Sequence, residues 1–240
     1  MITVACVWWG TKFPIEYVIN LKASIERNTT VDHKFVCFSD REVPGIETKI
    51  LKKGYDGWWN KLQLFDCSHG LSERVIYFDL DTLITGNLDW LFNYEGNFMG
   101  IEDVGCVNAH QPHLKNVLQS AVMTWKYYLW NSIWTHANHN MKEVQSKYRG
   151  YGEFLHGYMN PLRYELLQQE FPGKLKSYKY QVYPNRPDKD TSIVCFHAIP
   201  SIIQAQTEIT RTTMGLYKPV NWIKDYGESN EESSSYHRKW

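Results

Sequence analysis

The first hundred residues of this chain alternate between short apolar runs rich in β-branched side chains and segments of helical periodicity. Such runs, bounded by turn residues, are typical of strands, and their alternation with helices is typical of a mostly parallel sheet. The strands that this pattern predicts are residues 2–7, 33–38, 46–51, 74–78, 98–102 and 193–196. The sequence therefore predicts an α/β fold.

Helical periodicity begins after the first predicted strand. The apolar face of this helix is expected to consist of Ile15, Val18, Ile19 and Ile25, which recur at helical spacing. A second helix is expected at residues 58–65, directly before the strongest strand signal in the chain. Helices are thus expected to separate the parallel strands.

The pattern is less regular in the second half of the chain. Residues 120–134 indicate a strand followed by a helix, and residues 141–167 indicate two helices broken at Gly150 and Pro161. Residues 1–225 contain neither an internal repeat nor a linker composition, so we expect one domain there.

The ends of the chain differ in composition from each other. Residues 228–235 are rich in serine and glutamate and cannot bury apolar surface, and residues 226–240 are predicted to be a disordered tail. The apolar start has no basic leader and is expected to form a strand rather than a signal peptide. No apolar run approaches the length of about 18 residues that a membrane span needs, so none is expected.

Charge and cysteine content narrow the functional classes. Lys plus Arg and Asp plus Glu both number 26, so no net positive field would attract nucleic acid. The five cysteines are odd in number and widely spaced, and most lie in apolar runs where a reduced thiol packs as a small hydrophobe. We therefore expect a cytoplasmic protein with no nucleic-acid partner.

The predicted strand at residues 74–78 ends directly in Asp79-Leu80-Asp81. Ligands of open α/β sheets bind at the carboxyl ends of the strands. At a strand-to-turn junction both carboxylates can reach one divalent cation, and such a cation neutralises charge that develops on a departing diphosphate. The motif is thus a candidate metal-diphosphate site, with a plain acidic turn as the alternative.

Residues 75–88, which contain this motif, resemble the metal-binding segment of glycosyltransferase family 8 and its bacterial and viral relatives. Further segments follow in the order expected for that family. They are Phe38-Ser39-Asp40, residues 57–62, Ser120-Ala121-Val122-Met123 and residues 193–197. The resemblance covers roughly residues 2–200, and the Asp-x-Asp segment is its specific part.

The resemblance implies a Rossmann-like GT-A fold in one domain, with a mixed, mostly parallel central sheet. It also implies metal-dependent transfer of a sugar, with retention of configuration, from a nucleoside diphosphate sugar to a carbohydrate or glycoconjugate acceptor. The donor is expected to be a UDP-sugar. Asp79, Asp81 and His197 would bind the metal, Mn²⁺ or Mg²⁺. Taken alone, a histidine at the end of an apolar strand is more often structural than a ligand.

Donor-binding residues are also expected at the carboxyl edge of the sheet. The resemblance implies that Asp40 lies near the nucleoside, and that Lys61 and Asp79 face the donor. Trp8 and Trp9 close the first strand beside Gly10, where an aromatic side chain could stack on the base, with core packing as the equal alternative; Trp8 and Gly10 are the residues assigned to the donor. For Lys61 the alternative is a solvated helix face.

Two departures from the family pattern concern catalysis and phosphate binding. The family's Gly-Asp-Gln is replaced by Gly150-Tyr151-Gly152-Glu153. Glu153 and Asp103, which follows the predicted strand at residues 98–102, are therefore the candidate catalytic residues, although Asp103 could simply begin a turn.

The second departure follows His197, where Ala198-Ile199-Pro200-Ser201 replaces the family's glycine and Lys-Pro. The lysine that would bind the diphosphate is missing there. Lys61 or Lys218 could replace it.

Two other functional classes are compatible with the sequence. Asp79-Leu80-Asp81-Thr82-Leu83 also resembles the nucleophile motif of haloacid dehalogenase-type phosphohydrolases, although the usual glycine after the second acid is missing. The two departures also allow a non-catalytic nucleotide-sugar binder of the same fold. The identity of the sugar, the acceptor and the oligomeric state are left open.

Overall fold

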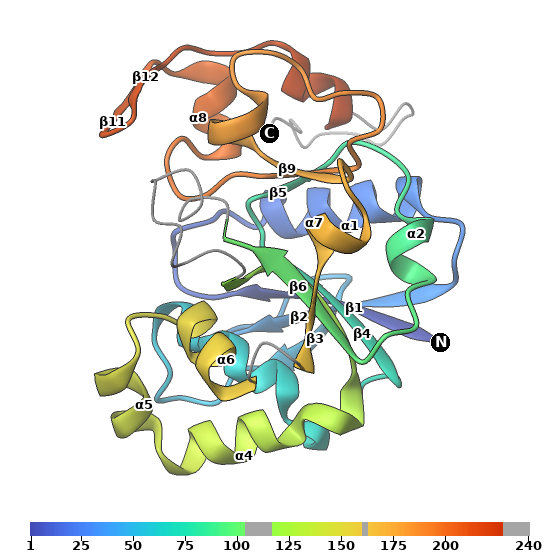
Figure 1. Cartoon of the computed structure of the whole chain (residues 1–240), viewed down its shortest axis with the longest axis vertical. Coiled ribbons are helices and arrows are strands. Elements are labelled where there is room, and N and C mark those ends of the chain that lie inside the picture. Colours follow the sequence, from blue (N-terminus) through green and yellow to red (C-terminus); the bar gives the residue numbers. More distant parts are fainter. Residues whose placement is uncertain (104–116, 160–162, 228–240) are drawn as a thin grey trace.

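A seven-stranded sheet forms the centre of the computed structural model, which describes residues 1–103, 117–159 and 163–227 (Figure 1). In spatial order its strands are β3 (Glu47–Ile50), β2 (His33–Ser39), β1 (Ile2–Trp8), β4 (Arg74–Phe78), β7 (Leu118–Lys126), β6 (Phe98–Glu102) and β8 (Glu165–Leu166). The first four strands are parallel, and β7 runs antiparallel to both β4 and β6. The predicted mixed, mostly parallel α/β sheet is confirmed.

The parallel register brings the carboxyl ends of the central strands to one edge. Val4 of β1 lies opposite Phe35 of β2 and Ile76 of β4. Asp40, which follows β2, and Asp79, which follows β4, therefore leave the sheet at the same edge, as the sequence predicts.

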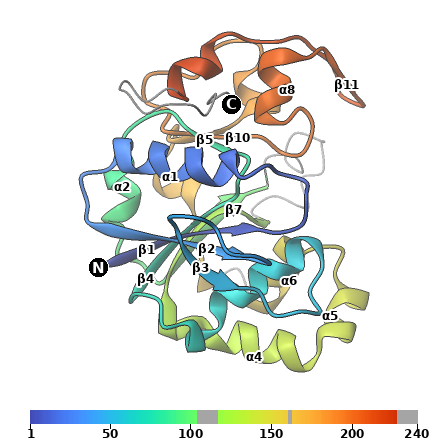
Figure 2. The same cartoon turned by 180° about the vertical axis from the view of Figure 1, so that it is seen from behind.

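Helical segments cover both faces of the sheet, as Figures 1 and 2 show. The α-helices are α1 (Glu16–Asn28), α2 (Asp89–Phe92), α4 (Asn131–His139), α5 (Met141–Lys147), α6 (Tyr151–Met159), α7 (Leu167–Glu170) and α8 (Ile202–Thr207). The 3₁₀ and π segments are η1 (Gly57–Phe65), η2 (Cys67–His69), η4 (Tyr127–Trp130), η6 (Tyr178–Val182) and η7 (Trp222–Tyr226). Helix α1 lies on one face, and η1, α4 and α6 lie on the other.

The continuous apolar run of β1 is explained by burial on both of its faces. Val4 and Cys6 pack in the core under α1, whereas Ala5 and Val7 pack in the second core under η1, α4 and α6. A strand that is buried on both faces shows no polar alternation.

A second, three-stranded sheet lies beside the main one, in the order β5 (Thr82–Ile84), β10 (Ile193–Cys195) and β9 (Leu175–Ser177). The predicted strand at residues 193–196 is confirmed as β10, but it belongs to this sheet. Strand β5 begins directly after Asp81 and pairs antiparallel with β10, with Thr82 opposite Cys195. This pairing joins the Asp-x-Asp turn to the segment that carries His197. A hairpin of β11 (Thr210–Thr212) and β12 (Gly215–Tyr217) follows α8.

The structure corrects several local predictions. Ile19 does not belong to the buried face of α1: it is 41% exposed, whereas Tyr17 and Leu21 are buried. The helix expected at residues 58–65 is the 3₁₀ segment η1. The two helices expected within residues 141–167 are α5 and α6, with Gly150 between them as predicted, but the segment ends in β8 and the first residue of α7.

Two further expectations concern the ends and the membrane. Most of the tail predicted to be disordered, residues 228–240, lies outside the described residues. No helix among the described residues is both long and apolar enough to cross a membrane.

Candidate active site

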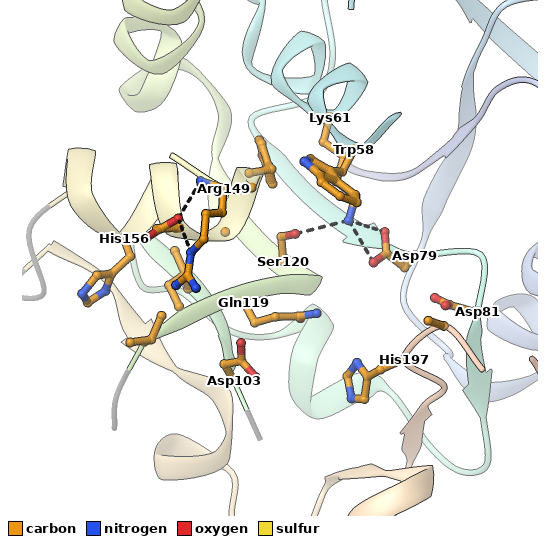
Figure 3. A pocket seen from close by; sticks show the side chains of 17 residues that line it. Trp58, Lys61, Asp79, Asp81, Asp103, Gln119, Ser120, Arg149, His156 and His197 are labelled. Atoms are coloured by element: carbon orange, nitrogen blue, oxygen red, sulfur yellow. Dashed lines mark hydrogen bonds and ion pairs between the residues drawn. The ribbon is translucent and has the colours of Figure 1, made fainter. Parts of the chain in front are cut away.

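Asp79 is held by contacts from β7, from β4 itself and from η1. Its backbone N–H donates to the carbonyl of Ala121 on β7 at 2.8 Å, and the hydroxyl of Tyr77 donates to its carboxylate. Lys61 Nζ, which reaches in from η1, lies 2.6 Å from Oδ1 and 2.9 Å from Oδ2, and it also donates to Ser120 Oγ at 3.2 Å (Figure 3). Lys61 is thus the counterion of Asp79 rather than part of a solvated helix face.

Asp81 lies two residues further along the chain and directly precedes β5. Its backbone carbonyl accepts a hydrogen bond from the N–H of Phe196 at 2.9 Å, which continues the ladder between β5 and β10. Burial, followed by the charge of Asp79, raises the pKa of Asp81 from its ordinary 3.8 to about 7. Two carboxylates so close together in a partly dry site favour the binding of a cation.

His197 follows Phe196 and is brought to the same region by β10 (Figure 3). Its Nε2 is buried and has no hydrogen-bond partner among the described residues. Burial, together with the nearby charge of Lys179, lowers the pKa of His197, so the imidazole is neutral near pH 7. A neutral imidazole with an unpaired nitrogen beside two carboxylates has the chemistry of a Mn²⁺ ligand set.

The residues therefore fit a divalent cation chemically, but their side chains are not gathered into a finished site. Among the described residues, no three His, Cys, Asp or Glu side chains converge closely enough to hold a metal ion. Both oxygens of Asp79 are engaged by Lys61. Binding of a cation would require Asp79 to share or exchange this contact.

Two cavities meet at the Asp-x-Asp turn. The larger, of about 660 Å³, extends toward Asp103, Gln119, Arg149, Glu153 and His156. The smaller, of about 350 Å³, extends toward Trp9, Lys12, Phe13 and Tyr77. Both are lined by Trp58, Lys61, Asp79 and Asp81. The two carboxylates thus lie where a ligand in one cavity would meet a ligand in the other.

The two candidate catalytic residues both line the larger cavity. Glu153, in the first turn of α6, accepts hydrogen bonds from the backbone N–H of Arg149 at 2.7 Å and from its Nε at 3.5 Å. Asp103 follows β6, and its backbone N–H donates to the carbonyl of Val117 at 2.9 Å. Figure 3 shows Asp103 on the side of the cavity away from Asp79.

The residues expected to bind the nucleoside differ in whether they reach a cavity. Trp8 is 7% exposed, donates to the carbonyl of Phe13 at 2.8 Å, and lines neither cavity. Its neighbour Trp9 is 39% exposed and lines the smaller cavity. The alternative of core packing therefore holds for Trp8, and the tryptophan that is available for stacking is Trp9.

Gly10 and Asp40 contact each other at the sheet edge. Gly10 has a φ of +61°, a backbone conformation that favours glycine, and its N–H donates to Asp40 Oδ2 at 2.9 Å. Arg41 pairs with Asp40 Oδ1 at 3.0 Å and lies over the Trp8 ring. These contacts fix the loop after β1, and neither Gly10 nor Asp40 lines either of the two cavities at the Asp-x-Asp turn.

Several residues that line the cavities carry no signal in the sequence. Arg149 precedes α6 and His156 lies within it, and the apolar periodicity of this helix does not indicate a ligand. Gln119 lies within β7. Trp58 belongs to the 3₁₀ segment η1, and Lys12 belongs to the loop after β1. Tertiary contacts decide the direction in which each of these side chains points.

Comparison with known proteins bears on the fold. No family model matches the sequence, and no curated protein sequence matches it. Solved structures do match. The galactosyltransferase LgtC, crystallised with donor and acceptor sugar analogs, has 10% identity and a TM-score of 0.59 over 84% of this chain and 89% of LgtC.

Two longer proteins are also similar. The glycosyltransferase GlyE of Streptococcus pneumoniae TIGR4 has 14% identity and a TM-score of 0.66, and the match covers 95% of this chain but 61% of GlyE. The bifunctional glycosyltransferase WbbM has 9% identity and a TM-score of 0.57, with coverage of 94% and 48%. At these identities the likeness establishes the architecture alone, and the chain has the GT-A fold of these glycosyltransferase structures.

Proposed function

We propose that this protein transfers a sugar from a nucleoside diphosphate sugar, with uridine diphosphate as the carrier, to a hydroxyl group of a carbohydrate or glycoconjugate. The observation that carries the proposal is that Asp79 and Asp81 line both cavities, while His197, whose Nε2 has no hydrogen-bond partner among the described residues, lines the larger one beside them. The glycosyltransferase fold of the solved neighbours supports it.

The two cavities suggest a division of the substrates. The smaller is lined by aromatic side chains, which suit the base of a nucleoside, and by the two carboxylates, which suit its diphosphate when a divalent cation lies between them. The larger, lined by Asp103, Gln119 and Glu153, offers polar partners for sugar hydroxyls and is the proposed place of the transferred sugar and the acceptor. The bond to be exchanged would then lie close to Asp79 and Asp81.

In the proposed reaction the bond between the anomeric carbon and the diphosphate oxygen breaks, and its electron pair stays on that oxygen. The acceptor hydroxyl oxygen forms the new bond to the same carbon, and its proton passes to the diphosphate oxygen. A divalent cation, Mn²⁺ or Mg²⁺, supplies charge neutralisation of the departing diphosphate when bound at Asp79, Asp81 and His197. Attack on the face from which the diphosphate leaves would retain configuration and needs no protein nucleophile.

The protein's own groups orient the reactants in this scheme. Lys61 and the Tyr77 hydroxyl hold the carboxylate of Asp79 in a fixed direction at the junction. Glu153 and Asp103 lie across the larger cavity, where they could accept hydrogen bonds from the sugar or the acceptor. The cytoplasm, where nucleotide sugars and reduced thiols are both available, is the proposed location.

A thermal-shift panel tests this function. The melting temperature of the parent is measured with uridine, guanosine and adenosine diphosphates and their sugars, with and without Mn²⁺. We expect stabilisation by UDP or a UDP-sugar that needs Mn²⁺ and is lost in Asp81→Asn. A ligand at a hundred times its dissociation constant adds about 2.7 kcal/mol.

Release of free UDP from UDP-sugars separates a transferase from a non-catalytic binder, which would bind the nucleotide without turnover. Hydrolysis of p-nitrophenyl phosphate without any response to nucleotide would instead favour the phosphohydrolase. Nucleotide binding without release of UDP, or hydrolysis of p-nitrophenyl phosphate without any response to nucleotide, would contradict the proposed function.

A further inference from the structure

Lys12 differs from the other cations that line the two cavities. Lys61 is paired with Asp79, and Arg149 is paired with Glu153. Lys12 lines the smaller cavity with an exposed side chain and forms no ion pair or side-chain hydrogen bond with any described residue. Its Nζ lies 4.7 Å from the centre of the Phe13 ring, which is a weak contact at an exposed site. Its positive charge is therefore available to a ligand.

The position of Lys12 relates it to the carboxylate turn. Lys12 and Asp81 line the same cavity, so a ligand there would face both the ammonium and the carboxylate. An anion in this cavity would lie between the Lys12 ammonium and a cation held by Asp79 and Asp81. Phosphate groups match such a position, because a lysine ammonium acts on phosphate as a compact point charge.

The remainder of the cavity indicates what is attached to the anion. Trp9, Phe13, Trp58 and Tyr77 line it, and Trp9 and Trp58 are 39% and 56% exposed. Exposed aromatic side chains offer stacking surfaces to a planar ring. An aromatic ring joined to a short anionic chain describes a nucleoside diphosphate.

Two other lysines that could be considered, Lys179 and Lys218, do not line either cavity. Lys179 donates to the backbone carbonyl of His197 and lines neither cavity. Lys218, which the sequence offers as a substitute for the lysine missing after His197, lies after β12 and lines neither cavity. Among the described residues, Lys12 is thus the lysine with both the exposure and the position to contact a diphosphate.

We propose that Lys12 binds the diphosphate of the donor opposite the Asp79 and Asp81 carboxylates and stabilises the charge on the departing nucleoside diphosphate. This inference rests on the proposed function and names a residue for it. Lys12 keeps its proton throughout: it donates hydrogen bonds to phosphate oxygens and takes part in no covalent step.

Isothermal titration calorimetry of two Lys12 variants tests the proposal. Lys12→Met removes the charge and Lys12→Arg keeps it, while Lys53→Met removes an exposed lysine that lines neither cavity. Each protein is titrated in Mn²⁺ with UDP, UMP and uridine. An exposed ammonium-phosphate contact is worth roughly a tenfold change in affinity.

We expect Lys12→Met to bind UDP about tenfold more weakly than the parent and to bind uridine equally well. Lys12→Arg should retain most of the UDP affinity, and Lys53→Met should match the parent. The UDP affinity of Lys12→Met should also fall less steeply with added salt.

Unchanged UDP affinity in Lys12→Met, or an equal loss for uridine and UDP, would overturn the assignment of Lys12 while leaving the proposed function intact. A parent protein that binds no nucleotide with or without Mn²⁺ would overturn both.

Discussion

Replacement of Lys61 by Met tests the electrostatics of the site. The ion pair between Lys61 and Asp79 is largely removed from solvent, with side chains 12% and 19% exposed and Nζ–O distances of 2.6 and 2.9 Å. At an effective dielectric constant of about 20, charges this close attract by about 6 kcal/mol before the desolvation penalty is counted. Removal of one partner from a buried pair typically costs about 3–5 kcal/mol.

Two features of the site reduce the expected loss. Asp79 remains partly exposed, and it still accepts a hydrogen bond from Tyr77. We therefore expect Lys61→Met to lower the free energy of unfolding by about 2–3 kcal/mol in the presence of EDTA. Lys22→Met, which removes a surface pair with Glu26, is the matched control and should change it by less than about 0.5 kcal/mol.

Addition of Mn²⁺ separates the two roles of Lys61. Without the ammonium, both oxygens of Asp79 are open to the metal, so Mn²⁺ alone should stabilise Lys61→Met more than it stabilises the parent. Urea unfolding in EDTA and in Mn²⁺ measures both effects. Suppose that Lys61→Met is as stable as the parent in EDTA and responds equally to Mn²⁺. This result would refute the view that Lys61 neutralises the Asp79 carboxylate in the absence of a metal.

Two further predictions concern other charged and titratable groups. His197→Ala should leave the metal-free melting temperature nearly unchanged and remove most of the stabilisation by Mn²⁺ and UDP. The control is His69→Ala, at a half-buried histidine whose Nε2 lies 4.0 Å from Asp66 Oδ2, which should reduce stability without changing the metal response. The reverse pattern would make His197 a structural residue. Burial acts to raise the pKa of Asp66, but hydrogen bonds from Lys52 and Ser68 outweigh it and lower this pKa. The stabilisation by Asp66 is therefore present above pH 3.8 and lost as pH falls through the lower folded-state pKa. Asp66→Asn should be less stable than the parent by about 1–2 kcal/mol at pH 7, with a gap that closes in acid urea titrations; a gap that does not change with pH would contradict this.

Strands β1, β2 and β4 of the main sheet are predictable because burial on both faces makes their sequences largely apolar. The run at residues 74–78 therefore places Asp79 at the carboxyl edge without further information. Strands β5 and β9 are three residues long and leave no comparable pattern. The route by which His197 reaches Asp81 depends on that short pairing, which only family resemblance anticipates.

The lining of the cavities is the part that periodicity cannot predict. Trp8 and Trp9 are adjacent and chemically identical, yet the backbone directs Trp8 into the core and Trp9 into the smaller cavity. Lys12 reaches the same cavity from a loop, where neither period 2 nor period 3.6 applies. Such side chains are positioned by tertiary contacts of the loop rather than by local propensity.

Anomalous diffraction tests directly whether Asp79, Asp81 and His197 bind a divalent cation together with a nucleoside diphosphate. Crystals grown with Mn²⁺ and UDP would be measured near the manganese absorption edge. We expect one strong anomalous peak within about 2.5 Å of a carboxylate oxygen of Asp81 and of Nε2 of His197, next to the diphosphate. Ordered UDP without such a peak, or a peak held by other residues, would contradict this assignment.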